Sequence, residues 1–384
     1  MNGLSRRDFV RTLGRGSAGV LTGAFIVSRG REALTGEEPA VIQGVLPPTD
    51  INLIRLDSNE NPLGPGKAVL DAVRAAFGES GRYPDNPSVA LTAALMKLHG
   101  VADTNIVLGS GSGEILRMSV HAFTSPARPL VQGQPTFEDP SRYADVIGTP
   151  VVAVPVDRDL KLDLPAMAGR SAGAGLVFLC NPNNPTATVH SSAAVADFIA
   201  SVLRVSPETT ILVDEAYHHY IEDPSYGTAI PLALENPRVV VCRTFSKAYG
   251  MAGLRIGYAV GHAETIKVLR RHKLSNNVNV LGATAAMSAL GQPGFVERER
   301  TRNREVRELT CRAFDHMGFK AGVSETNFIM VDIRRDVKAF QAACRARGVA
   351  VGRPFPPLTT HARISLGSAD EMRKAITVIR SVLG

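Results

Sequence analysis

The strongest constraint on the fold is an alternation of short apolar runs with helix-forming segments between about residues 105 and 260. The runs are rich in Val, Ile and Leu, as are strands that are buried on both faces of a sheet. Strands that alternate with helices form βαβ units, in which the strands lie parallel. The pattern therefore predicts an α/β fold, with a three-layer domain built around a mostly parallel sheet. The runs expected to form its strands are 105–108, 129–131, 151–154, 175–179, 210–213, 239–242 and 256–260.

The alternation ends near residue 275, and the rest of the chain has a different pattern. A long charged helix is expected first, followed by short strands and helices that predict a smaller α+β domain. A chain of 384 residues is long enough for two domains. We therefore expect a signal-like segment 1–34, an N-terminal arm 35–75, a large domain 76–275 and a small C-terminal domain 276–384.

The first residues resemble a bacterial twin-arginine export signal, because Arg6 and Arg7 lie in the segment Ser-Arg-Arg-Asp-Phe-Val-Arg. The apolar stretch 16–27 that follows is too short to cross a membrane, so no stable membrane span is expected. The resemblance predicts a periplasmic or exported protein, and a cytoplasmic protein with a basic N-terminus is the alternative. No clear cleavage motif follows, so a cut signal and an uncleaved anchor both stay open.

The net charge of +7 is concentrated at this end, since segment 1–34 alone carries a net +4. The remaining +3 does not indicate a nucleic-acid-binding surface, which needs clustered basic residues. Four cysteines are too few and too scattered for a disulfide framework or a zinc site. Adjacent His218 and His219 diverge and have no acidic or cysteine partner at ligand spacing. We therefore expect neither a nucleic-acid partner nor a metal.

Lys247 is the most informative candidate for chemistry. It follows the apolar run 239–242 and the hydroxyl residues Thr244 and Ser246, and it precedes Arg255. Poor solvation just beyond a buried strand lowers the pKa of an ammonium group and leaves a nucleophilic amine. Hydroxyl groups and a guanidinium are suitable donors to a phosphate. A nucleophilic lysine beside such donors is what pyridoxal 5′-phosphate requires of its protein.

Asp214 and a glycine-rich loop extend this interpretation. Asp214 ends the run 210–213, where an ionised carboxylate is costly unless it has a partner. The protonated ring nitrogen of pyridoxal phosphate is such a partner, and Tyr217 can donate to the phenolic oxygen of the ring. Loop 109–113 leads into a helix whose N-terminus attracts anions. Its Gly-x-Gly-x-Gly spacing differs from the dinucleotide motif, which argues against a nicotinamide-dependent dehydrogenase.

Taken together, these motifs resemble the class I/II pyridoxal-phosphate aminotransferases of fold type I, and most closely the histidinol-phosphate aminotransferase family. The resemblance covers roughly residues 50–384. The motifs that carry it, in order, are Asn59-Glu-Asn-Pro, Arg82-Tyr-Pro-Asp, loop 109–113, Pro135-Thr-Phe, Asn181-Pro-Asn-Asn-Pro-Thr, Asp214-Glu-Ala-Tyr, Ser246-Lys and Ala362-Arg-Ile-Ser-Leu-Gly.

The resemblance implies roles for individual residues. Lys247 would bind the cofactor aldehyde, Asp214 would pair with the ring nitrogen, and Asn184 and Tyr217 would hold the phenolic oxygen. The other cofactor contacts implied are the ring of Phe137, the backbone amides of Ser112 and Gly113, the side chains of Thr244, Ser246 and Arg255, and Tyr83 at the phosphate in a neighbouring subunit. The role of Tyr83 implies a homodimer.

The same resemblance assigns substrate contacts. Arg363 would bind a substrate carboxylate, and Asn59 and Asn327 would add further contacts. The segment that begins at Arg353 lies on the expected substrate side, either as a rigid loop or as a determinant of specificity. The sequence departs from the family pattern at three positions: Ala187 replaces a glycine, Gly113 replaces an aspartate found in many relatives, and Phe137 replaces the commoner tyrosine.

The expected activity is a ping-pong transfer of an amino group between an amino acid, or a histidinol phosphate-like amine, and a 2-oxo acid. A decarboxylase or cyclase that uses the same fold and cofactor is one alternative. A non-catalytic binding protein with this fold is the other, although retained Lys247, Asp214 and Arg363 argue against it. The identity of the amino donor stays open, because an imidazole, an aromatic ring and a phosphate ester all fit the motifs.

Overall fold

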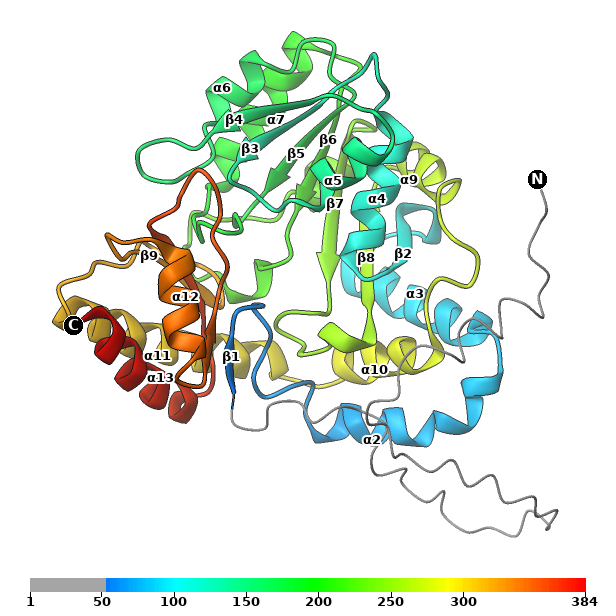
Figure 1. Cartoon of the computed structure of the whole chain (residues 1–384). Coiled ribbons are helices and arrows are strands. Elements are labelled where there is room, and N and C mark those ends of the chain that lie inside the picture. The colour runs from blue at the N-terminus through cyan, green and yellow to red at the C-terminus, as the bar shows by residue number, and fades with distance from the viewer. Residues whose placement is uncertain (1–52) are drawn as a thin grey trace, which may run out of the picture. The chain divides into compact units, whose positions relative to one another are not determined.

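A seven-stranded sheet forms the centre of the larger part of the protein in a computed structural model that describes residues 53–384 (Figure 1). Its order is β2-β8-β7-β6-β5-β3-β4, and only the contacts of β8 with β2 and β7 are antiparallel. The predicted α/β fold with a mostly parallel sheet is therefore confirmed. The strands are β2 (Ile106–Ser110), β3 (Leu130–Gln134), β4 (Val151–Pro155), β5 (Leu176–Cys180), β6 (Thr210–Asp214), β7 (Val239–Thr244) and β8 (Ile256–Gly261).

Both faces of this sheet are covered, which explains why its strands are apolar throughout. In β5, Leu176 and Phe178 pack against one layer of helices, while Val177 and Leu179 pack against the other. The first layer contains α4 (Ser112–Phe123), α5 (Asp139–Val146) and α9 (Ala263–Arg270). The second contains α2 (Lys67–Ala75), α3 (Asp85–His99), α6 (Leu164–Gly169), α7 (Ser192–Val205), α8 (Ile230–Glu235) and α10 (Val280–Leu290).

A second core lies around shorter strands near the end of the chain. Strand β9 (Phe328–Asp332) pairs with β11 (His361–Ser365), and β10 (Val349–Val351) pairs in parallel with β1 (Ile54–Leu56). Helices α11 (Phe295–His316), α12 (Val337–Arg345) and α13 (Ala369–Leu383) pack on these strands. Because β1 joins β10, this middle part of the N-terminal arm belongs to the second core, and Leu56 is buried in it.

Helix α10 lies just beyond the domain boundary expected at residues 275/276. It lies within the range assigned to the small domain, yet it packs beside α2 (Figure 1) and contacts α3. Its alanines are buried in the same core as the large sheet. The two cores divide within α11 instead, since Phe295 belongs to the first core and Phe314 to the second. An alanine-rich helix has little preference of its own for either core, so its sequence pattern did not reveal this placement.

A buried ion pair supports the loop that follows β6. Arg243 donates from Nη2 and Nε to Oε2 of Glu215 at 2.7 and 3.0 Å, and both side chains are buried. The hydroxyl of Thr228 and the backbone N–H of Ala229 also donate to this carboxylate. Because Glu215 follows Asp214 directly, the network fixes the backbone on which Asp214 stands.

Breaking this pair should destabilise the fold strongly. Arg243→Met leaves Glu215 buried without its cation, and we expect the free energy of unfolding to fall by roughly 3–5 kcal/mol. Arg373→Met breaks the exposed pair with Asp370 and should cost less than about 1 kcal/mol. Urea unfolding of the two variants compares them. Equal losses would show that the buried pair contributes no more than the exposed one.

Candidate active site

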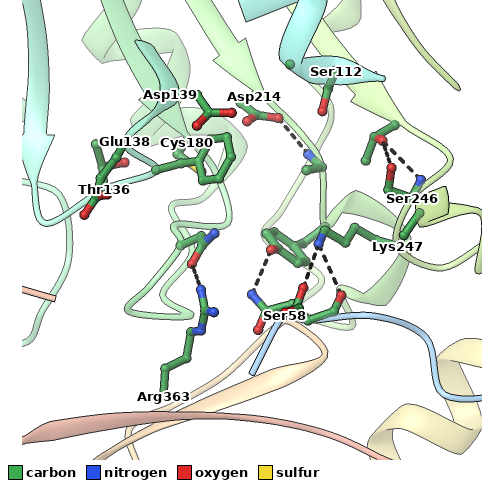
Figure 2. Close-up of a pocket in the computed structure, with 18 of the residues that line it drawn as sticks. Ser58, Ser112, Thr136, Glu138, Asp139, Cys180, Asp214, Ser246, Lys247 and Arg363 are labelled. Atoms are coloured by element: carbon green, nitrogen blue, oxygen red, sulfur yellow. Dashed lines mark hydrogen bonds between the residues drawn. The ribbon is translucent and has the colours of Figure 1, made fainter. Parts of the chain in front are cut away.

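A cavity of about 490 Å³ lies at the carboxyl ends of the parallel strands and is lined by residues of both cores (Figure 2). This is the edge of an α/β sheet where ligands bind. Asp214 and Lys247 reach it from the central sheet, and Arg363 reaches it from β11. The other expected residues that line it are Asn59, Ser112, Gly113, Phe137, Asn184, Tyr217, Thr244, Ser246 and Arg255.

The amine of Lys247 lies among carbonyl groups of the arm. Its Nζ donates to the carbonyl oxygens of Ser58 at 3.4 Å and Asn59 at 3.2 Å (Figure 2). Burial, together with the nearby charge of Arg363, lowers the pKa of Lys247 to about 8. A fraction of this amine is therefore unprotonated near neutral pH, which is the form that attacks a carbonyl carbon.

Asp214 is a buried acidic residue at the end of β6. Its side chain accepts a hydrogen bond from the backbone N–H of Ala216 at 3.1 Å, and the residue is 3% exposed. Within residues 53–384 it forms no ion pair at 4 Å or less. Burial raises the pKa of Asp214 to about 7. A cation placed in the cavity would relieve this cost, and a protonated pyridine nitrogen fits that requirement.

One side of the cavity is built to hold an anion. Ser112 begins α4, and Gly111 before it has a φ of 75°. A Cβ at Gly111 would lie 2.2 Å from Nη2 of Arg255, so only glycine lets the guanidinium approach the loop. Arg255 Nη1 donates to the hydroxyl of Ser246 at 3.3 Å, and Thr244 donates to the same hydroxyl at 3.0 Å. A helix N-terminus, two hydroxyls and a guanidinium fit a phosphate group.

Arg363 lies in the cavity and forms no ion pair with an acidic side chain of residues 53–384. Its guanidinium donates to Oδ1 of Asn184 at 2.7 Å and to the carbonyl of Asp57 at 2.6 Å. It stacks 4.6 Å from the ring centroid of Phe355, and its buried Nε has no hydrogen-bond partner among the residues described. Burial lowers the pKa of Arg363 to about 10, still well above neutral. This fixed, charged group is suited to binding a carboxylate or phosphate.

Two expected site residues lie outside this cavity. Asn327 is fully buried, and its amide donates to the carbonyls of Asn59 and Glu60 at 3.0 and 3.2 Å. Asn327 does not line the cavity, and the substrate contact that the resemblance implies for it stays a prediction. Tyr83 is 77% exposed and borders a separate surface hollow with Asn276 and Val280. It lies away from the cavity of its own chain.

Glu138 and Arg142 line the cavity although no motif indicated them, and they lie beside Arg353 of the segment expected on the substrate side. Glu138 forms ion pairs with Arg142 at 2.9 Å and Arg353 at 2.6 Å. The guanidinium of Arg353 lies 4.4 Å from the ring of Phe355, on which Arg363 also stacks. No local pattern reveals the pairing of Glu138 with Arg353, because these two residues come from separate parts of the chain.

Other candidate features can be placed within residues 53–384. No group of three or more His, Cys, Asp and Glu side chains there could hold a metal ion. His218 instead pairs through Nδ1 with the hydroxyl of Tyr226 at 3.2 Å. None of the helices in this range has the length and apolar character needed to cross a membrane. The arginines of segment 5–11 lie outside the described residues.

Known proteins are similar to this chain in sequence and in fold. Residues 51–379 match the family described as aminotransferase class I and II. Histidinol-phosphate aminotransferase of Symbiobacterium thermophilum is 37% identical over 336 residues, covering 87% of this chain and 91% of the relative. An aromatic amino acid aminotransferase of Thermobifida fusca is 34% identical, covering 85% and 89%. The structure of histidinol-phosphate aminotransferase from Sinorhizobium meliloti with pyridoxal 5′-phosphate superposes with a TM-score of 0.80 at 27% identity, covering 86% and 90%.

Proposed function

We propose roles for the cavity residues on one premise, which is that this chain belongs to the aminotransferase class I and II family. It is a pyridoxal-phosphate-dependent enzyme that transfers an amino group between an amino compound and a 2-oxo acid by a ping-pong mechanism. When bound, the cofactor supplies an aldehyde that accepts the amino group and a protonated ring that withdraws electrons from the substrate Cα.

Lys247 is proposed to bind the cofactor and to move the proton. Its lowered pKa of about 8 supports attack by the free amine on the aldehyde carbon. Once the substrate amine has displaced it, the same Nζ would remove the proton from the substrate Cα and deliver it to the former aldehyde carbon of the cofactor, which receives the amino group. The carbonyls of Ser58 and Asn59 hold Nζ at the edge of the cavity.

Other residues are proposed to hold the cofactor. Asp214, which pairs with no cation among the described residues, would keep the ring nitrogen protonated. The phosphate is bound by the start of α4 together with Thr244, Ser246 and Arg255. Since Arg363 occupies Oδ1 of Asn184, the Nδ2 of that amide is free to donate to the phenolic oxygen.

The substrate is proposed to carry an anionic group that binds Arg363. The observation that supports this most directly is the buried guanidinium, which has an unpaired Nε and no acidic partner within residues 53–384. Two amino donors are candidates because of the relatives: a histidinol phosphate-like amine and an aromatic amino acid. A screen for conversion of the cofactor by each amine, read from its absorbance, separates them. Release of carbon dioxide instead of amino transfer to 2-oxoglutarate would support the decarboxylase alternative.

Substitution of Arg363 should weaken substrate use selectively. Arg363→Ala removes the charge-assisted contacts, and we expect kcat/KM for the preferred donor to fall by about 10²–10³-fold. Cofactor absorbance should stay close to that of the parent protein. Arg74→Ala, at an exposed arginine paired with Asp71, is the control and should leave kcat/KM unchanged. An unaltered kcat/KM in Arg363→Ala would exclude this residue as the anion-binding group.

Homodimer formation and export are also proposed. Phe77, Tyr83 and Val89 are large apolar or aromatic side chains, close in sequence, that are 57%, 77% and 70% exposed. Such side chains are suited to a contact with a second copy. The twin-arginine-like segment 5–11 supports export to the periplasm. A sedimentation mass of one chain would contradict the dimer, and unprocessed protein confined to the cytoplasm in a producing bacterium would contradict export.

A further inference from the structure

Asn59 joins both cores at the cavity through all of its polar groups. Its backbone N–H donates to the hydroxyl of Ser365 at 2.8 Å, and its carbonyl accepts from Lys247 and Asn327. In the side chain, Oδ1 accepts from Ser365 at 2.8 Å, while Nδ2 donates to the hydroxyl of Tyr217 at 3.0 Å. Its φ of 54° lies in the left-handed region, which asparagine adopts more readily than most residues.

The directions of these bonds determine where the proton of Tyr217 can go. A backbone N–H can only donate, so the hydroxyl oxygen of Ser365 accepts from it and uses its single proton for Oδ1 of Asn59. That fixes the amide with Nδ2 towards Tyr217. The phenolic oxygen of Tyr217 therefore accepts this bond, and its own proton is free for another acceptor. Burial raises the pKa of Tyr217, so the phenol keeps that proton.

We infer that Asn59 and Ser365 are positioning residues that hold Tyr217 as a hydrogen-bond donor into the cavity. The inference rests on the proposed function, because the phenolic oxygen of the bound cofactor is the acceptor that Tyr217 would meet there. It gives Asn59 a task different from the substrate contact suggested by its motif. Its side chain is buried between two protein hydroxyls, and the residue is 1% exposed.

The same residue links Tyr217 to the second core. Ser365 ends β11, the strand that carries Arg363, while Tyr217 follows β6 of the central sheet. A change in the position of β11 therefore reaches Tyr217 through two hydrogen bonds, and it reaches Lys247 through the carbonyl of Asn59. Substrate binding at Arg363 and donation by Tyr217 thus share a common support.

The test is Asn59→Asp, which keeps the size and backbone preference of asparagine but reverses one bond. An ionised carboxylate only accepts, so the proton of Tyr217 would turn towards Asp at this position and away from the cavity. The holoenzyme is titrated while the absorbance of its bound cofactor is recorded. A hydrogen-bond donor at the phenolic oxygen of the cofactor stabilises the anionic form of that oxygen. Losing the donor should therefore raise the midpoint pH of the absorbance change by about one pH unit.

Three variants decide whether the effect passes through Tyr217. In the Tyr217→Phe background, Asn59→Asp should add little further shift, whereas a full additional shift would indicate a simple charge effect and overturn the inference. Ser365→Ala leaves the amide free to rotate and should raise the midpoint by about half a unit. Asn236→Asp adds a charge at a residue that does not line the cavity and should leave the midpoint unchanged.

The outcomes separate this inference from the proposed function. An unshifted midpoint in both Asn59→Asp and Ser365→Ala, with cofactor bound, overturns the positioning role alone. A parent protein that shows no cofactor absorbance contradicts the proposed function itself. If Asn59→Asp does not fold, Ser365→Ala provides the test instead. Its midpoint shift should be present in the parent protein and absent in the Tyr217→Phe background, and any other result overturns the inference.

Discussion

Lys247→Ala is expected to lower the rate of amino transfer by at least about 10⁴-fold, since it removes both the nucleophile and the proton carrier. The substitution takes away Nζ and leaves the anion-binding side of the cavity intact. Thr244, Ser246 and Arg255 do not depend on Lys247 for their hydrogen bonds. The variant should therefore still bind the cofactor, and equilibrium dialysis checks this while a coupled assay with 2-oxoglutarate measures turnover.

A small amine separates the chemical role of Lys247 from a structural one. Added methylamine can enter the space left by the side chain and accept the proton, so it should restore part of the lost rate in Lys247→Ala. The rate should rise with the concentration of unprotonated amine. Methylamine should not change the rate of Asn236→Asp, whose side chain does not line the cavity. A Lys247→Ala variant that turns over at the parental rate would exclude the proposed mechanism.

The strands of the central sheet were predictable because burial on both faces leaves a continuous apolar run, as in Val239–Thr244. Their directions were harder to infer. Strand β8 is antiparallel to its neighbours although its sequence is as apolar as theirs. The pairing of Ile54 with Val349 joins segments far apart in the chain, and no local pattern marks it.

The site was predictable where a polar residue ends an apolar run. Asp214 and Lys247 stand out because they follow buried strands at the sheet edge where ligands bind. Ser365 gives no such signal, since a serine within a strand has many ordinary explanations. Its contact with Asn59 exists only because β11 is brought against the arm, so tertiary packing was needed to find it.

Asp214→Asn is expected to lower kcat by roughly 10³-fold while it stabilises the protein that lacks cofactor. An amide cannot hold the ring nitrogen in its protonated state, so electron withdrawal from the substrate Cα is lost. Asparagine has the shape of aspartate and can still accept from the backbone N–H of Ala216. The loss of activity should therefore occur without unfolding, which circular dichroism can establish.

The gain in stability follows from the raised pKa of Asp214. The folded protein binds this proton with a pKa of about 7, whereas an unfolded aspartate has a pKa near 4. The cofactor-free protein therefore loses stability as the pH rises from about 4 to about 7, because Asp214 then ionises more readily in the unfolded chain. Above that range the loss is complete. Asparagine has no such cost, so cofactor-free Asp214→Asn should be more stable at pH 8 by roughly 2–4 kcal/mol.

The stability difference between Asp214→Asn and its parent should vanish near pH 4, where the Asp214 carboxyl is largely protonated in the folded and the unfolded chain. At pH 8 the difference should reverse when the cofactor is bound. The cofactor gives the carboxylate of Asp214 a cationic partner, so binding should stabilise the parent protein at pH 8 more than it stabilises Asp214→Asn. Thermal unfolding of Asp214→Asn and its parent at pH 4 and pH 8, with and without pyridoxal phosphate, measures the stability difference under each of these four conditions. Exposed Asp145→Asn should show no such dependence. If cofactor-free Asp214→Asn were less stable than its parent at pH 8, Asp214 would already have a stabilising partner within the protein. Its carboxylate would then not need the cation that a bound cofactor provides.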